Sequence, residues 1–440
     1  MAAHDGEINH KSLLKLAIPN IMANLSLPLA GLVDVALLGH LPQIEPLAGV
    51  ALAGLIFDYV FMGFVFIRMS TTGLVAQALG AGDMEASAAL FFRSLFIGLG
   101  LGSLMLLARG PIGGLGFLLL DGEALVEAQG LIYYSIRIWG APASLGTFAV
   151  TGWLLGRHHV KSALILSVVL NGLNILLDYI FIFRLGWGTA GAAYATLIAE
   201  VTAFLVGLFL VRARWGQHPL PPLKRIWERG DLIEQLRLQA NILIRSFCLV
   251  STLAVFTNLS AHFGNTVLAA NAILLRLLNT TAYFIDGFSH SLESMAGRFA
   301  GAQDWRAVRE SLRLSLIWNI SMVLLCITLF LCCGELIIRG LTSHDAVVAS
   351  ARVNIPYVCI ALLFSGFAYI YDGLFLGLSS GKLMRNAMLV SIAGFLPIAF
   401  LADVLQRPEF LWIALIVFMA LRALTLGRHT GNIEYIARNK

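Results

Sequence analysis

The most constraining feature of this 440-residue chain is a series of apolar segments, each long enough to cross a bilayer. A membrane-spanning helix needs roughly 20 predominantly apolar residues. Twelve such runs lie at residues 13–40, 47–69, 88–109, 131–156, 163–184, 190–211, 237–262, 267–292, 312–333, 353–378, 384–405 and 409–427. Their continuous apolar character predicts helices, because spanning β-strands would alternate over about ten residues. The predicted fold class is therefore all-α integral membrane.

Charge supports this interpretation and predicts the orientation. Only 12% of residues are charged, whereas soluble domains carry about 25%. Lys and Arg gather in alternate loops, which places both termini in the cytoplasm by the positive-inside rule. We expect a multi-pass protein of the bacterial plasma (inner) membrane. The net charge of +5 follows from this topology, and the basic loops lack the interleaved aromatic residues of a nucleic-acid site.

An internal repeat divides the chain into two halves. A shift of 221 positions brings residues 80–83 (GAGD) onto 301–304 (GAQD). The same shift brings residues 152–156 (GWLLG) onto 373–377 (GLFLG). One ungapped offset that holds over more than a hundred residues predicts two duplicated six-helix lobes.

The repeat also predicts how the lobes are related. Because six is an even number, both halves enter from the cytoplasm and the repeat is parallel. The expected organisation is an N-lobe (1–212), a cytoplasmic linker (213–236) and a C-lobe (237–440). Two such lobes, forming a V around a central cleft, suit a transporter that alternates its access.

Asp34 is the only charged residue between Leu16 and Leu41. An acid at membrane depth is expensive and usually functional. Pro19 and Pro28 lie in the same run, and each removes a helical hydrogen bond and favours a bend. The first helix therefore combines a titratable group with a hinge.

The fifth run contains the most promising polar constellation. Asn171, Asn174 and Asp178 are spaced by three and four residues, so they share one helix face. Two amides beside a carboxyl group could hold its proton, coordinate a cation or stabilise the anion. A helix–helix hydrogen-bond cluster is the structural alternative.

Several segments together resemble a known family. They are residues 31–40 (GLVDVALLGH), 68–74 (RMSTTGL), 171–178 (NGLNILLD), 283–288 (YFIDGF) and 371–373 (YDG). On these residues the chain resembles the MATE (multidrug and toxic compound extrusion) family, in particular its DinF branch, over nearly its whole length. The resemblance implies a twelve-helix antiporter that exports amphipathic, often cationic compounds against an inward proton or sodium gradient.

The resemblance also implies a coupling site. In proton-coupled relatives an N-lobe cavity holds residues that match Asp34, Asn174, Asp178 and Thr196 here, and Pro19 matches the proline that bends the first helix. Two neighbouring carboxyl groups in a poorly hydrated cavity would titrate as a pair. We expect the Asp34–Asp178 pair to load protons from outside while the first helix bends at Pro19.

Sodium coupling through the same N-lobe oxygens is the alternative, since carboxylate, amide and hydroxyl groups also suit a hard cation. The resemblance implies that a C-lobe sodium site would use acids on the seventh and tenth helices. The seventh run here carries Arg245 and no Asp or Glu, which disfavours such a site. The C-lobe still has a polar stripe of Asp286, His290 and Glu293, with Asp372 on the tenth run. This stripe is expected to line a substrate cavity, to form a second protonation site, or to form an ion-pair network with Arg245 or Arg276.

Other classes of protein fit less well. A flippase for lipid-linked substrates would line its cavity with basic groups, whereas the N-lobe candidates here are acids. No nucleophile motif, phosphate loop or paired metal ligands indicate an enzyme, and the five cysteines lack metal-site spacing. We expect no cofactor and no metal site, small amphipathic or cationic molecules and the lipid bilayer as partners, and a monomer.

Overall fold

The computed structural model describes residues 8–40, 43–120, 123–216 and 219–438. Helices make up nearly all of these ranges, and no strand occurs within them, which confirms the predicted all-α class. The chain divides into two compact units. We call Met22–Gln235 the N unit, and residues up to Ile21 together with Leu236–Lys440 the C unit. The expected lobe boundaries at 212 and 237 stay a prediction.

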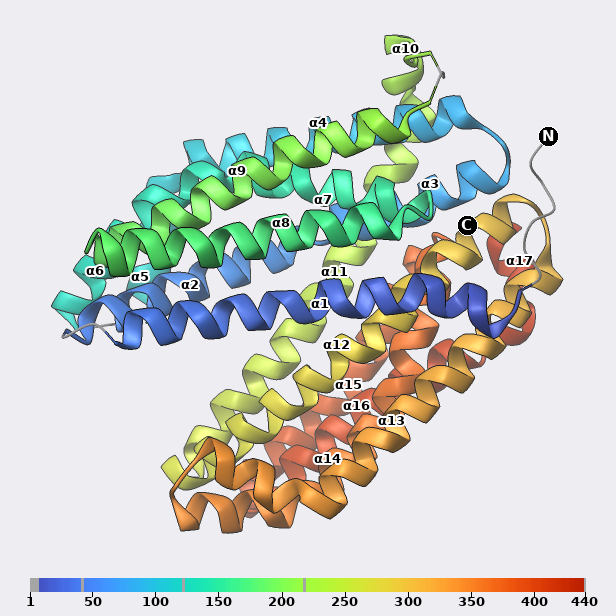
Figure 1. The fold of residues 1–440 in the computed structure, drawn as a ribbon. Helices are drawn as coiled ribbons and strands as arrows, with labels where there is room; N and C mark the ends of the chain where they lie inside the picture. Colours follow the sequence, from blue (N-terminus) through green and yellow to red (C-terminus); the bar gives the residue numbers. More distant parts are fainter. Residues whose placement is uncertain (1–7, 41–42, 121–122, 217–218, 439–440) are drawn as a thin grey trace. The chain divides into compact units, whose positions relative to one another are not determined.

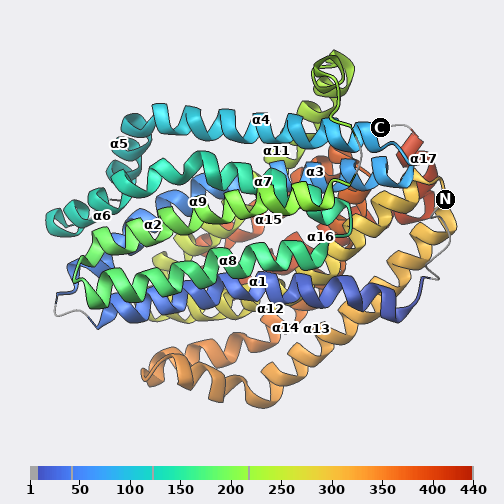
Figure 2. The same cartoon turned by 45° about the horizontal axis from the view of Figure 1, so that its top comes forward.

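Two long helices, α1 (His10–Gly39) and α11 (Arg229–His262), contribute to both units. The other N-unit helices are α2 (Glu45–Phe64), α3 (Phe66–Gly80), α4 (Met84–Leu107), α5 (Arg109–Leu120), α6 (Ala124–Arg137), α7 (Ala141–Gly156), α8 (Val160–Asp178), α9 (Gly188–Arg214) and α10 (Leu223–Ile226). The C unit adds α12 (Asn265–Gly301), α13 (Trp305–Leu341), α14 (Asp345–Gly377), α15 (Gly381–Leu405), α16 (Glu409–Gly427) and α17 (Ile433–Arg438). Within the N unit, α4, α7, α8 and α9 run lengthwise beside one another (Figures 1 and 2).

Eleven helical segments in the described part of the chain are long and apolar enough to span a membrane. The expected run at 131–156 is not among these eleven, and its helix is interrupted. Its α6 and α7 are separated by a 3₁₀ turn at Ile138–Gly140, directly before Pro142, whose ring opposes the preceding helical turn. Counting α6 and α7 as one broken span is consistent with twelve.

The sequence repeat corresponds to repeated structure at two helix starts. Asp83 caps α4 by accepting a hydrogen bond from the Ala86 backbone (2.8 Å), and Asp304 caps α13 through Ala307 (2.9 Å). The residue before each cap, Gly82 or Gln303, adopts a positive φ that reverses the chain. The repeated tetrapeptide is therefore a turn followed by an N-cap.

The repeated glycines allow close helix packing in both halves. A Cβ added to Gly152 of α7 would lie 2.7 Å from the backbone oxygen of Arg68 on α3. A Cβ added to Gly373 of α14 would lie 2.4 Å from the backbone oxygen of Ser289 on α12. Equivalent positions of the two halves thus bring equivalent backbones into contact.

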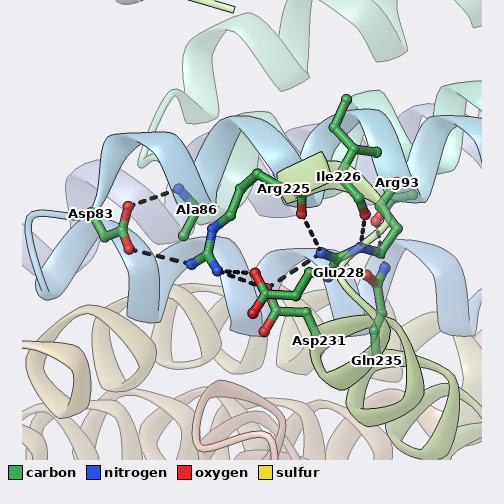
Figure 3. Close-up of polar contacts among 9 residues, drawn as sticks. Asp83, Ala86, Arg93, Arg225, Ile226, Glu228, Asp231 and Gln235 are labelled. Carbon is green, nitrogen blue, oxygen red and sulfur yellow. Dashed lines mark hydrogen bonds and ion pairs between the residues drawn. The ribbon is translucent and has the colours of Figure 1, made fainter. Parts of the chain in front are cut away.

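The segment between the halves is fastened to α4 (Figure 3). The Arg93 guanidinium is 1% exposed and donates to the backbone oxygens of Ile226 (2.8 Å) and Arg225 (3.2 Å), which are carbonyls at the end of α10. Arg93 also pairs with Asp231 (3.4 Å), and Arg225 pairs with Glu228 (2.5 Å). Within the N unit, one buried cation thus caps α10 and holds the start of α11.

Candidate functional site

The carboxyl group of Asp178 lies at a change of helix type. Asp178 is the last residue of α8, and the chain continues as a π-helix over Tyr179–Arg184. Such π segments are frequent at functional sites because they re-aim side chains. Asp178 is 1% exposed, and its Oδ2 accepts a hydrogen bond from Nδ2 of Asn174, one turn earlier (2.8 Å).

Asp34 of α1 meets Asp178 in the N unit. The two carboxyl groups lie within hydrogen-bonding range of each other. Among the described residues, Oδ1 of Asp34 and Oδ1 of Asp178 are both buried without a hydrogen-bond donor. A buried oxygen without a donor is costly, and two of them in one site indicate that a proton or a cation is needed there.

Thr196 of α9 extends the site, as the sequence predicts. Its Oγ1 accepts a hydrogen bond from Asn174 Nδ2 (3.4 Å) and donates to the backbone oxygen of Ala192 (3.0 Å). Asn171 is attached elsewhere, because its amide donates to Oγ of Ser26 on α1 (2.6 Å). The structure thus brings Asp34, Asn174, Asp178 and Thr196 together, and Asn171 fastens α8 to α1.

α1 continues as a helix through Pro19 and Pro28. Its two parts have different attachments: Asn20 donates to Oγ of Ser291 in the C unit (3.3 Å), whereas Ser26 accepts from Asn171 in the N unit. The division between the units falls between Ile21 and Met22, less than one turn after Pro19. Pro19 therefore lies much closer than Pro28 to the point where the packing partners of α1 change.

In the C unit, Asp372 belongs to an ion-pair cluster. The guanidinium groups of Arg245 and Arg422 both donate to its Oδ2. Asp286 acts electrostatically on Arg422, which also lies over the ring of Tyr369 (4.9 Å). Of the two expected roles, Asp372 takes the ion-pair role with Arg245. A cavity lined by Asp286 and His290 stays a prediction.

Two pairings differ from simple expectation. Glu200 is the only charged residue of its apolar run and Arg422 is the only basic residue of its own, so the two could pair with each other. Instead Glu200 pairs with Arg137 (3.5 Å), and Arg422 pairs with Asp372. Such partners cannot be read from sequence, because they depend on which helices pack against one another.

Sequence reasoning missed Arg137 and Tyr133. The positive-inside count assigns Arg137 to the outer face, but its side chain packs within the N unit at the end of α6 and is 16% exposed. A usable signal was present, because Arg137 is the only charged residue of the run 131–156. The criterion that identifies Asp34 thus also identifies Arg137.

No group of three or more His, Cys, Asp or Glu residues in the described ranges has the geometry to hold a metal ion. In the acid site, Oδ1 of Asp34 and Oδ1 of Asp178 are the oxygens without a described partner. Asn174 contributes amide N–H groups to both Asp178 and Thr196, and Asp178 uses one oxygen to accept from it. The arrangement is suited to holding protons between two carboxyl groups.

Comparison with known proteins places the chain in context. A MatE family model matches residues 19–180 and 242–404. The chain is 37% identical to DNA damage-inducible protein F of Escherichia coli over 97% of this chain and 94% of that protein. It is 25% identical to a probable multidrug resistance protein NorM of Thermotoga maritima, over 89% and 85%. A solved structure described as MATE in the straight conformation has the same fold, with a TM-score of 0.87 at 20% identity over 98% and 97% of the two chains.

Proposed function

The chain belongs to the MATE family of multidrug efflux transporters, and from this premise we propose that it exports amphipathic cations in exchange for protons. It is a multi-pass membrane protein and not an enzyme. The observation that carries the proposal is the meeting of Asp34 and Asp178, each with one buried oxygen that lacks a donor among the described residues.

The chemistry of this pair favours protons. Two carboxylates in a poorly hydrated site repel each other and are both desolvated, so at least one takes up a proton near neutral pH. One shared proton supplies a donor between the two orphan oxygens. Asn174 then holds the second oxygen of Asp178 in place. Sodium remains the alternative, and it would need oxygen ligands where Asn174 presents N–H groups.

Proton loading is coupled to movement of α1 in this proposal. The carboxyl group of Asp34 lies on the part of α1 attached to the N unit, while Asn20 is attached to the C unit. Pro19 removes a helical hydrogen bond close to the change in attachment, so bending there costs little. Neutralising the pair then allows α1 to bend and cargo to leave; deprotonation on the cytoplasmic side restores a site for cationic cargo.

The remaining parts of the proposal follow from the topology. Lobes 1–212 and 237–440, joined by the linker 213–236, alternate access as two parallel halves. Both termini face the cytoplasm, the membrane is the bacterial inner membrane, and the protein acts as a monomer. A flippase for lipid-linked substrates is disfavoured because the N-unit site is rich in acids.

The test is transport by purified protein in proteoliposomes. We expect efflux of a fluorescent organic cation under an imposed pH gradient, loss of efflux with a protonophore, and no efflux under a sodium gradient alone. Asp34→Asn is expected to reduce proton-driven efflux at least tenfold while the protein still folds. Full proton-driven efflux by Asp34→Asn would rule out this mechanism, and efflux driven by sodium alone would favour the alternative.

A further inference from the structure

Arg137 occupies an unusual position for a cation. It is the last residue of α6, at the break before the 3₁₀ turn, and its side chain is 16% exposed. The Cζ atom lies 4.5 Å from the ring centroid of Phe57 and 5.7 Å from that of Tyr133. Ring faces and a nearby acid stabilise a guanidinium at this depth, where an isolated charge would be costly.

Several acids surround this cation in the N unit. Glu200 of α9 pairs with it directly, its Oε1 lying 3.5 Å from Nη2 of Arg137. Asp58 of α2 and Asp34 of α1 also interact with it electrostatically. Another cation, Arg109 at the start of α5, lies over the ring of Trp139 (5.2 Å). One buried cation thus serves several carboxyl groups, one of which belongs to the coupling pair.

A chain of hydrogen bonds also connects Arg137 to the Asp34–Asp178 pair. Nη1 of Arg137 donates to the Tyr133 hydroxyl (3.3 Å), and that hydroxyl is a hydrogen-bonding neighbour of Thr196. Thr196 Oγ1 donates to the backbone oxygen of Ala192 and accepts from Asn174. Asn174 in turn donates to Asp178.

Glu200 competes for the same cation. Its side chain is 8% exposed, its Oε1 pairs with Arg137, and Ser144 is a hydrogen-bonding neighbour of its carboxyl group. Nε of Arg137 is buried with no acceptor among the described residues. Glu200 therefore does not satisfy the whole guanidinium group, which leaves part of the positive charge available to other acids.

We propose that Arg137 is a positioning residue for the coupling pair, a resident cation divided between Glu200 and the Asp34–Asp178 site that sets the pH at which this site releases protons. The inference rests on the proposed proton coupling. A nearby cation favours the ionised carboxylates, so Arg137 promotes proton release to the cytoplasm. Glu200 draws the cation away and opposes that effect.

Arg137 and Glu200 therefore have opposite expected effects on the pH dependence of efflux. Proton-driven efflux is measured in proteoliposomes as a function of pH on the cytoplasmic side. Arg137→Gln is expected to raise the pH of half-maximal efflux by about one unit, the scale of one charge–charge interaction in a partly dry site. Glu200→Gln is expected to lower it. Arg137→Lys should keep the midpoint close to that of the unchanged protein.

A matched control is the removal of another arginine from the same unit. Arg184 lies over the ring of Tyr179 (5.6 Å), and Arg184→Gln is expected to leave the midpoint unchanged. The double variant Arg137→Gln/Glu200→Gln removes both charges, so it tests the inference even if a single variant folds poorly. We expect its midpoint to rise as in Arg137→Gln.

The outcomes separate this inference from the proposed function. Equal-sign shifts in Arg137→Gln and Glu200→Gln, or a double variant with an unchanged midpoint, would show that the pair only stabilises the fold. If Asp34→Asn abolishes proton coupling but neither Arg137 nor Glu200 variants move the midpoint, only the role of Arg137 is wrong. If Asp34→Asn is fully active, the coupling assignment itself fails.

Discussion

The buried charge clusters of the N unit and the C unit are opposite in composition. The N-unit cluster holds several acids and one arginine, and its atoms without partners in the described ranges include carboxylate oxygens of Asp34 and Asp178. In the C-unit cluster, two arginines share Asp372, and the atoms without described partners are guanidinium nitrogens of Arg245 and Arg422. In the N-unit cluster, carboxylate oxygens lack hydrogen-bond donors. In the C-unit cluster, the Asp372 carboxylate has a donor from each of two arginines.

This difference separates a site that titrates from a site that holds the fold. A carboxylate between two guanidinium groups stays ionised, because protonation would leave both cations uncompensated. A pair of carboxyl groups with orphan oxygens changes state with every proton. Equivalent-looking acids in apolar helices therefore have different roles, and substitutions can test them.

The largest effect is expected from Asp372→Asn. The substitution leaves Arg245 and Arg422 buried without their anion, and breaking a buried pair in this way costs about 3–5 kcal/mol. Asp178→Asn should cost little stability, because an amide relieves the repulsion with Asp34, yet it should abolish proton coupling. Thermal unfolding in detergent compares the two variants. A greater loss of stability in Asp178→Asn than in Asp372→Asn would contradict the structural role assigned to Asp372.

A smaller loss of stability is expected at the repeated glycines, where both units have the same close helix packing. Gly373→Ala places a methyl group against the Ser289 backbone oxygen, and Gly152→Ala does the same at Arg68, so each should lose about 1–3 kcal/mol. Gly100 has no neighbouring atom within 4 Å of an added Cβ, and Gly100→Ala is the control. The melting temperatures of the three variants measure the effect. A stable Gly373→Ala would show that the close approach is not required.

Thr196→Val sharpens the account of the N-unit cluster. The substitution keeps the shape of the side chain but removes the hydroxyl that accepts from Asn174 and neighbours the Tyr133 hydroxyl, which should cost about 1 kcal/mol of stability. It should also interrupt the connection between Arg137 and Asp178 and move the pH midpoint of efflux. Thr196→Ser is expected to retain that midpoint. A Thr196→Val protein with the midpoint of the unchanged protein would show that the hydroxyl plays no part in coupling.

The smallest effect concerns His159, which lies before α8 and outside the spanning helices. Burial, followed by the charges of Arg157 and Arg214, lowers the pKa of His159 to about 4. A histidine held neutral binds fewer protons than in the unfolded chain, so its contribution to stability is lost as the pH falls from about 6.5 towards 4. His159→Gln should flatten that acid-side loss of melting temperature.

His159→Gln also tests whether the pH dependence of transport originates in the N-unit cluster. The pH midpoint of efflux should be the same in His159→Gln and the unchanged protein, because this histidine stays neutral near pH 7. A shifted midpoint in His159→Gln would move the pH dependence away from the N-unit cluster.

Much of the fold could be predicted because its signals are local. Long apolar runs report the helices, and a fixed offset reports the duplication. The repeated Asp83 and Asp304 even report the helix starts, since an N-cap acts within one turn. The break in the fourth span was not predicted, because the apolar run continues through Ile138–Gly140, although Pro142 in the same run was a usable signal.

The candidate site was predictable where polar residues share one helix. Asn174 and Asp178 are one turn apart, so their contact follows from helix geometry. Arg137 was overlooked because a loop charge and a buried charge look alike near the end of an apolar run. Its depth became evident only from its position at the end of α6, against Phe57 and Glu200.

By itself, the sequence determined that this protein is helical, crosses the membrane many times and carries Asp34 within lipid, because hydropathy and chain length suffice for those conclusions. The tertiary structure alone decided which charge each acid faces. Glu200 and Arg137 are 63 residues apart, and Asp372 is 127 and 50 residues from its two arginines. Pairing over such separations depends on how helices pack, and that packing determines which acid can titrate and which one is held as a permanent anion.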